Sequence, residues 1–530
     1  MKRVISLILV LCFIGVALIA CGNKEEVKPT ESAPTSTLAP TDEYGQELFE
    51  SVANWETDFD FEGETIGVLL REDKNYAREF GLEDPGDDQL DLAIDTRCQK
   101  VNSDLNVKIE LTHDNGPSGY DAMRDHYISL VTQDVTNEIC NYDIVAYFSY
   151  VAPQMSIRDF HANALNKDTF PYFDFQLPCW NQTIVNNTAV NGKLFYLAGD
   201  MNISMFNCAM IMWHNLDLYD EVREKFDDAP ENIQDMAVAG EWTYTELYRW
   251  TSYYEDKDPT SSCGDVYGIY LPGGRTGIPN PLDAIPYAWD LDIVTTNNDG
   301  SHKFNCIGNT KAEEAMVRYN DMFKGKGNSF YAFESDASTE HCNCGKGVRD
   351  HFVSGTVLFS AEPLYANESH NLAIRNMSDR YALLPHPKYD EEQDHYATTS
   401  QDSYTLMGIL DHGAHTVEKG GAISAYLQYS TEFSYTNVRG YYFERIVKPT
   451  YFGTDDSDGH VTKSIAIFNT VISNLGFDFW TIYSPLLNNS VHLFRDALAQ
   501  GFTLQSEYLA DQDKFDAAIY ETDQWLGIVS

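Results

Sequence analysis

The sequence has few basic residues for its length. Lys and Arg together number 36 against 81 Asp and Glu, which gives a net charge of -45 over 530 residues. A surface of this sign repels phosphate backbones and anionic lipid headgroups, so nucleic acid is excluded as an expected partner. Beyond that exclusion, the acidity indicates solubility and not a particular activity.

The sequence also lacks the short motifs of several enzyme classes. It contains no G-x-S-x-G, no H-E-x-x-H and no G-x-x-x-x-G-K-[ST]. The stretch TDDSDG at 454–459 does not fit a calcium loop, because its first position is Thr454 and its twelfth is Ile465. The stretch HCNC at 341–344 has no second ligand pair at zinc spacing nearby, which favours disulfides or free thiols over a metal site. We therefore expect no cofactor and no metal.

Only one apolar run is long, and it stands at the N-terminus. Residues 5–20 follow Lys2 and Arg3 and are shorter than the roughly 20 residues that span a bilayer, which indicates a signal peptide. Leu18-Ile19-Ala20-Cys21 resembles a bacterial lipobox, which implies cleavage before Cys21 and lipid on its sulfur. An ordinary secretory signal is the alternative.

The polar stretch after Cys21 predicts a tether. Residues 22–42 are rich in Pro, Ser, Thr and Ala and cannot build a core. We predict a lipoprotein signal peptide over 1–20, and a lipid anchor with a flexible tether over 21–45. The protein is then held by its lipid on the outer face of a bacterial cytoplasmic membrane.

Eight cysteines remain when Cys12 is removed with the signal peptide and Cys21 is lipidated. They are Cys98, Cys140, Cys179, Cys208, Cys263, Cys306, Cys342 and Cys344. An even number outside the cytoplasm permits disulfides, but the sequence does not choose among the pairings.

Hydrophobic patterning predicts an α/β fold. In the first part of the chain, apolar strands are predicted over 64–70, 106–111 and 142–147, with helices over 90–105 and 120–131 between them. Strands that alternate with helices at this spacing form a parallel sheet through right-handed crossovers.

The second part of the chain predicts another lobe of the same class. Residues 205–219 predict an apolar strand that runs into a turn, and 295–304 a hairpin that turns at Asn298-Asp299-Gly300. Capping boxes predict helices that begin at Thr243 with Glu246 and at Thr310 with Glu313. A further strand is predicted to begin at 381 and to be followed by prolines. Another strand is predicted over 405–409, and a helix over 422–430.

These landmarks, in this order, resemble the extracellular solute-binding proteins of ABC importers, the family that includes maltose-binding protein. The pieces that carry the resemblance are DLAIDTRCQKVNSDLNVKIEL, YDIVAY, NGKLFYLAGDMNISMFNCAMIMWHNLDLY, EWTYTELYRW, DHFVSGTVLFSAEPLY, YALLPHPKYDEEQ, KGGAISAYLQYST and GTDDSDGHVTKSIAIFNTVISNLGFDFWTIY. The resemblance implies a two-lobed periplasmic-binding-protein-like fold with a hinge of crossing strands and a ligand cleft between the lobes. The N-terminal lobe is predicted to comprise 60–198 and 395–440, and the C-terminal lobe 199–394 and 441–530.

The resemblance also implies a function. A monomer of this family binds a small solute, here most simply a mono- or oligosaccharide, closes on it, and delivers it to the permease subunits of the transporter. No enzymatic activity is expected. The alternatives are a secreted carbohydrate-active enzyme and a surface glycan receptor that is not coupled to transport.

Candidate ligand-binding residues follow from the same landmarks. Tyr147 and Tyr150 stand at and beyond the end of the strand YDIVAY, where α/β sheets bind ligands. Tyr147 is either an aromatic platform or a residue that packs against a helix. Asp200 and Asn202 stand where the chain of a solute-binding protein first crosses the hinge, and Asp200 is either a ligand acceptor or a turn residue.

The later candidates belong to two other segments. Glu362 and Tyr365 follow a strand predicted over 356–360, where relatives have a stacking aromatic, although Leu364 competes for that place. Gln401 and Asp402 either edge the cleft or belong to an exposed loop. Trp289 and Trp480 are further aromatic candidates, whereas Trp242 is assigned to packing.

Overall fold

The computed structural model describes residues 41, 46–114, 116–117, 120–254, 266–272, 281–324, 329–332, 348–367, 374–453 and 455–530. Residues Asp42–Ser530 form one compact unit. The predicted signal peptide, Cys21 and most of the tether lie outside the described residues, as do Cys263, Cys342 and Cys344. The five described cysteines, Cys98, Cys140, Cys179, Cys208 and Cys306, are free thiols.

The first sheet has four strands in the order β11-β3-β1-β2. They are β11 (Thr405–Ile409), β3 (Ile144–Phe148), β1 (Glu64–Leu70) and β2 (Val107–His113). β1 pairs in parallel with β2 and β3, while β11 runs antiparallel to β3 with Thr405 opposite Phe148. Helices α3 (Gln89–Leu105) and α4 (Tyr120–Thr136) connect the parallel strands, which confirms the predicted strand–helix alternation. The side chain of Asp88 starts α3 by accepting from the backbone N–H groups of Leu90 and Asp91.

The second sheet has five strands in the order β10-β4-β9-β5-β8. They are β10 (Tyr381–Leu384), β4 (Met210–Asn215), β9 (Val357–Pro363), β5 (Tyr267–Pro272) and β8 (Ser329–Ala332). β4 is antiparallel to both of its neighbours, whereas β5 is parallel to β9 and β8. The sheet is therefore mixed.

The strand predicted over 205–219 is wrong at both ends. Residues before it form α7 (Ile203–Asn207), and the chain continues beyond β4 as α8 (Leu216–Arg223) and not as a turn. Asn215 explains the second difference, because its Oδ1 accepts a hydrogen bond of 3.0 Å from the backbone N–H of Leu218 and caps α8.

Both helices predicted from capping boxes are confirmed, but the capping hydrogen bonds of the two boxes are wrong. Thr243 precedes α10 (Tyr244–Thr251) but makes no capping hydrogen bond through its side chain. At α12 (Thr310–Lys324) the cap is Asn309, whose Oδ1 accepts from Ala312 N at 3.0 Å. Glu313 instead accepts a hydrogen bond from the backbone N–H of Gln505, at 2.8 Å. At α12, the side chain of Asn309 thus takes the capping role predicted for Thr310, and Glu313 bonds to a residue distant in the sequence.

The predicted hairpin is confirmed. β6 (Val294–Thr296) and β7 (His302–Phe304) pair antiparallel, and Gly300 takes a φ of 89° in the turn between them, a conformation that favours glycine.

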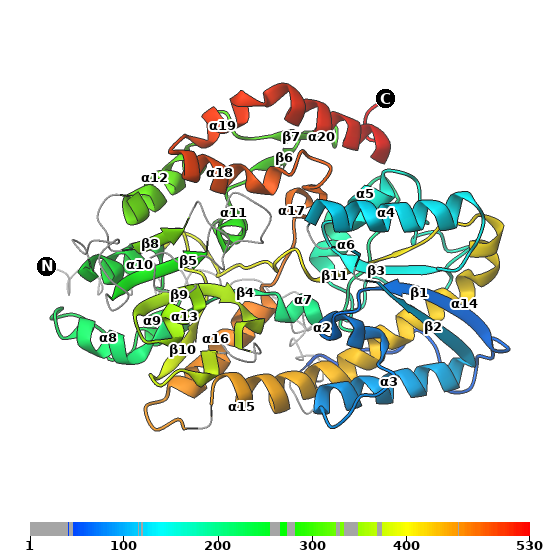
Figure 1. The fold of residues 1–530 in the computed structure, drawn as a ribbon, viewed down its shortest axis with the longest axis horizontal. Coiled ribbons are helices and arrows are strands. Elements are labelled where there is room, and N and C mark those ends of the chain that lie inside the picture. Colours follow the sequence, from blue (N-terminus) through cyan, green and yellow to red (C-terminus); the bar gives the residue numbers. More distant parts are fainter. Residues whose placement is uncertain are drawn as a thin grey trace, which may run out of the picture. The chain divides into compact units, whose positions relative to one another are not determined.

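The remaining helices cover the sheets and the hairpin (Figure 1). They are α2 (Lys74–Ala77), α5 (Ala152–Ser156), α6 (Gln182–Thr188), α9 (Gln234–Ala239), α11 (Ile285–Ala288), α13 (Val348–Val353), α14 (Ala414–Phe433), α15 (Lys448–Tyr451), α16 (His460–Ser473), α17 (Phe479–Tyr483), α18 (Leu493–Gln500), α19 (Leu504–Ala510) and α20 (Gln512–Leu526). Short 3₁₀ turns are η1 (Arg78–Phe80), η2 (Ser252–Tyr254), η3 (Pro281–Ala284), η4 (Leu364–Asn367), η5 (Ile374–Asn376) and η8 (Ser490–His492). No helix in the described part of the chain is long and apolar enough to cross a membrane.

Separate hydrophobic cores surround the two sheets. The chain passes between them in residues 197–210, 398–407 and 414–451, which we call the first, second and third crossing segments. The first two run side by side, since Leu197 and Met407 exchange two backbone hydrogen bonds of 2.9 Å. The third is the long helix from α14 to α15, which contains the π-helical stretches η6 (Ser434–Arg439) and η7 (Tyr442–Val447) (Figure 1). Connections of this kind suit a hinge, and π-helical turns often accompany functional sites.

Candidate functional site

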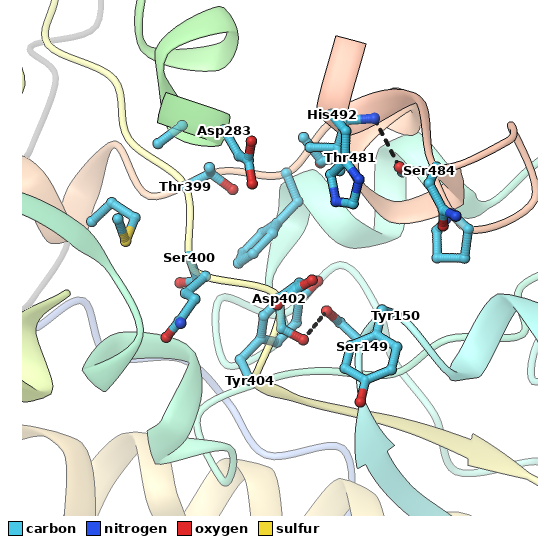
Figure 2. A pocket seen from close by; sticks show the side chains of 17 residues that line it. Ser149, Tyr150, Asp283, Thr399, Ser400, Asp402, Tyr404, Thr481, Ser484 and His492 are labelled. Carbon is cyan, nitrogen blue, oxygen red and sulfur yellow. Dashed lines mark hydrogen bonds between the residues drawn. The ribbon is translucent and has the colours of Figure 1, made fainter. Parts of the chain in front are cut away.

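A pocket lies where the first sheet meets the second crossing segment (Figure 2). Its lining combines residues that follow β3, residues of the second crossing segment and residues of the second lobe. They are Ser149, Tyr150, Met210, Asp283, Ala284, Thr399, Ser400, Gln401, Asp402, Tyr404, Phe477, Thr481, Ser484, Pro485, Asn489, Val491 and His492. The pocket has a volume of about 650 Å³, part of which is open to solvent.

Strand pairing explains how these residues meet. β3 ends at Phe148, and β11 begins at Thr405 directly opposite it, so the residues after β3 face the residues before β11. Ser149 donates from its backbone N–H to Tyr404 O at 3.1 Å and from its hydroxyl to Asp402 O at 2.8 Å (Figure 2). The pocket thus lies beyond the carboxyl end of β3, where open α/β sheets place ligands.

Asp402 is the most unusual residue of the lining. The residue is half-buried, and its Oδ1 atom is buried and has no hydrogen-bond partner. Burial and the neighbouring charge of Asp283 raise the Asp402 pKa to about 7, although Arg495 acts in the opposite direction. Arg495 Nη1 lies 3.1 Å from Asp283 Oδ2, so Asp283 has a cationic partner of its own. Asp402 is consequently poised between its protonated and ionised forms near neutral pH.

Four of the predicted ligand-binding residues come together here. Tyr150, Gln401 and Asp402 line the pocket. Tyr365, at the start of the turn that follows β9, donates from its hydroxyl to Gln401 Oε1 at 2.7 Å and so touches the lining. The side chain of Tyr150 stacks on Phe148 with ring centroids 5.2 Å apart.

The other four predicted residues are placed elsewhere. Tyr147 is fully buried against Tyr127, and its hydroxyl donates to Asp114 O at 3.4 Å. Glu362 is buried within β9, opposite Ile211 of β4.

Asp200 and Asn202 both belong to the first crossing segment. Asn202 Oδ1 accepts from the backbone N–H of Gly199 at 3.1 Å, which fixes the bend of the chain there. Asp200 Oδ1 lies 3.1 Å from Arg439 Nη1 and lines a different cavity together with that arginine. Burial raises the Asp200 pKa to about 6, against the opposing effect of Arg439. Asn202 therefore stabilises the first crossing segment internally, whereas Asp200 joins it to the third.

Sequence reasoning missed several residues of the lining. Ser149 and Tyr404 are sequence neighbours of predicted residues, and the pairing of two strand ends was the signal that could have found them. Phe477 stands in the quoted stretch GFDFW, but no pattern distinguished it from a core residue. Asp283 and His492 reach the pocket from distant parts of the chain, so no local signal identifies them.

One group of the described residues has the spacing for a metal ion. Side-chain atoms of Asp456, Asp458 and His460 lie within 4.8 Å of one another at the surface. Asp458 already accepts from Arg380 Nη1 at 2.7 Å, and exposed acidic groups of this kind are common without an ion. The group therefore does not establish a metal site. The HCNC stretch at 341–344 lies outside the described residues.

No protein-family model and no curated protein matches this chain. Solved structures do match it. The galacto-N-biose-/lacto-N-biose I-binding protein of the ABC transporter from Bifidobacterium longum, in complex with lacto-N-biose, aligns with a TM-score of 0.52 and 11% identity over 89% of this chain and 99% of that one. The sugar-binding protein MalE from Xanthomonas citri aligns with a TM-score of 0.53 and 10% identity, over 88% of this chain and 100% of that one.

A third solved structure agrees with these two. A family 1 extracellular solute-binding protein from Bifidobacterium longum subsp. infantis gives a TM-score of 0.50 and 11% identity over 86% of this chain and 100% of that one. At such identities the likeness concerns the fold. The chain has the periplasmic-binding-protein fold of extracellular solute-binding proteins, and the predicted fold class is confirmed.

Proposed function

We propose that this protein is the substrate-binding lipoprotein of an ABC transporter. It captures a small extracellular carbohydrate by hinge closure and delivers it to a membrane permease. In this proposal the N-terminal lobe comprises 60–198 and 395–440, and the C-terminal lobe 199–394 and 441–530. Cys21 carries the lipid that holds the monomer on the outer face of the cytoplasmic membrane, as expected from the lipobox-like sequence.

The observation that carries the proposal is the composition and position of the pocket. Tyr150, Tyr404 and Phe477 offer apolar rings to the C–H faces of a sugar, while serine, threonine, amide and carboxylate groups offer partners to its hydroxyls. These groups come from both lobes and from the second crossing segment, so closure of the hinge assembles them around a ligand.

The named ligands of the matched structures point in the same direction. Lacto-N-biose is a disaccharide, and the Xanthomonas citri protein is named as sugar-binding. We infer from these names, together with the pocket, that a mono- or oligosaccharide is the ligand of this chain.

A thermal-shift screen against sugars, amino acids and peptides tests the proposal, because a ligand that binds only the folded protein raises its melting temperature. We expect a carbohydrate to raise it. If only peptides or amino acids do so, the carbohydrate assignment is wrong.

A carbohydrate-active enzyme is the second candidate, because Asp283 and Asp402 line one pocket in different environments, as paired carboxylates do in glycoside hydrolases. Incubation of the protein with oligosaccharides separates the two functions. Binding without cleavage supports the transporter component, whereas cleavage that is lost in Asp402→Asn establishes the enzyme.

A further inference from the structure

Two carboxylates at the pocket have one arginine between them. Asp283 and Asp402 both line it, and Arg495 forms an ion pair with Asp283. Asp402 forms no ion pair with any of the described residues, and its Oδ1 is buried without a hydrogen-bond partner. The charge of Arg495 favours the ionised form of Asp402 but forms no direct pair with it, and a buried carboxylate oxygen without a partner is unfavourable, so the site as it stands leaves this atom unsatisfied.

Neighbouring basic side chains do not supply that partner. His492 lines the pocket, but burial and the charge of Arg495 lower its pKa to about 3, which leaves it neutral at physiological pH. The buried guanidinium of Arg71 does not line the pocket. It lies 3.3 Å from the ring centroid of Tyr76 and 3.9 Å from that of Phe148, and it donates to Thr405.

The rest of the lining suits a cation. Tyr150, Tyr404 and Phe477 contribute aromatic rings, and the last two lie with their centroids 4.8 Å apart. The faces of aromatic rings attract ammonium groups, most strongly where water is excluded. The neutral imidazole of His492 and the hydroxyl of Ser149 add acceptors for N–H groups.

We propose that the pocket selects an amino sugar, with its protonated primary amine bound to the carboxylate of Asp402. This inference rests on the proposed function, since it takes carbohydrate as the ligand class and adds a charge to it. An ammonium group brings three N–H donors and the positive charge that the pocket lacks. A neutral sugar offers hydroxyls to Asp402 but brings no positive charge to favour the ionised form of its carboxyl group.

The test is calorimetric titration with matched sugar pairs at pH 6.5. Glucosamine, galactosamine and mannosamine are each compared with the parent hexose and with the N-acetyl derivative, which has no charge. We expect at least one amino sugar to bind tenfold or more tightly than both of its neutral counterparts. Equal or tighter binding of a neutral counterpart overturns the inference and leaves the proposed function intact.

Two variants test whether Asp402 causes the preference for an amino sugar over its neutral counterparts. Asp402→Asn should reduce the tenfold preference to about one, whereas Asp513→Asn, which removes an exposed carboxylate on α20, should keep it. A preference that survives in Asp402→Asn contradicts the role of that residue. If Asp402→Asn does not fold, the titrations of the wild-type protein with the matched sugars decide alone whether the pocket prefers an amino sugar. Failure of every sugar to bind, or binding of spermidine in their place, overturns the inference and the proposed function together.

Discussion

Arg439 Nη1 lies 3.1 Å from Asp200 Oδ1, and this ion pair joins the first crossing segment to the π-helical stretch of the third. The carboxylate is buried, while the arginine is partly exposed and lies over Phe206, Tyr435 and Phe443 at 5.3 to 5.6 Å. The pair therefore fixes the relative positions of segments through which the lobes are connected.

Removing the arginine should destabilise the protein. Arg439→Gln leaves the buried Asp200 carboxyl group without its partner, and the loss of a partner from such a pair costs about 3 kcal/mol. Urea unfolding measures the change. The double variant Asp200→Asn with Arg439→Gln should recover much of the loss, because no charge is then buried alone. A single variant within about 0.5 kcal/mol of the wild type would show that the pair contributes nothing.

Asp402 should make the protein less stable as pH rises. Its pKa is raised from 3.8 to about 7, so the folded protein binds this proton more tightly than the unfolded chain does. The carboxyl group therefore lowers the free energy of unfolding progressively from about pH 4 to about pH 7, by at most about 4 kcal/mol. The side chain of Asp402→Asn cannot ionise. Denaturant unfolding should therefore show that the free energy of unfolding of the variant rises relative to that of the wild type between about pH 4 and about pH 7. Parallel pH profiles for the two proteins would contradict the prediction.

Two adjacent glycines of α14 should respond oppositely to alanine. A Cβ at Gly420 would lie 2.2 Å from the backbone oxygen of Thr169, whereas a Cβ at Gly421 would meet nothing nearer than 3.7 Å. Gly420→Ala should cost about 1 to 3 kcal/mol through overpacking. Gly421→Ala should stabilise the helix by up to about 1 kcal/mol. Denaturant unfolding of the two variants checks this, and similar effects at both positions would refute the close approach of α14 to Thr169.

Two neighbouring tyrosines should differ in their effect on ligand binding. Tyr150 lines the pocket, so Tyr150→Ala should weaken sugar binding by roughly ten- to a hundredfold. Tyr147 is buried outside the lining, so Tyr147→Phe should leave affinity unchanged while the fold is kept. Calorimetric titration of both variants with the sugar found in the screen measures their affinities. A larger loss of affinity in Tyr147→Phe than in Tyr150→Ala would show that the site is not at this pocket.

The lipid anchor is tested by growth of a producing bacterium with labelled palmitate. The wild-type protein should carry the label and fractionate with membranes, because we propose from the lipobox-like sequence that Cys21 is acylated. A Cys21→Ala variant labelled as strongly as the wild type would exclude the anchor.

The sequence predicted the first sheet well because its signals are local. Strands such as ETIGVLL are buried over most of their length, and the helices between them carry their own apolar stripes. The signals failed where one residue decides between two outcomes, as at Asn215, whose side chain turns the end of a strand into the start of a helix.

The candidate site was predicted only in part for a related reason. Tyr150 and Asp402, which were predicted from their places beside strand ends, line the pocket, because strand ends can be read from the sequence. Asp283 and His492 reach the same pocket from parts of the chain that only tertiary packing brings together. The partner of Asp200 is equally remote, since Arg439 lies on a different crossing segment. A buried ion pair of this kind leaves no pattern in the sequence.

Isothermal titration calorimetry of the purified protein with the sugar found in the screen, followed by mass spectrometry of the recovered solution, tests the central claim most directly. The account predicts saturable binding of one sugar per protein, a negative heat-capacity change from buried apolar surface, and recovery of the sugar intact. Recovery of cleaved sugar, or the failure of every carbohydrate to bind to the folded protein, would contradict it.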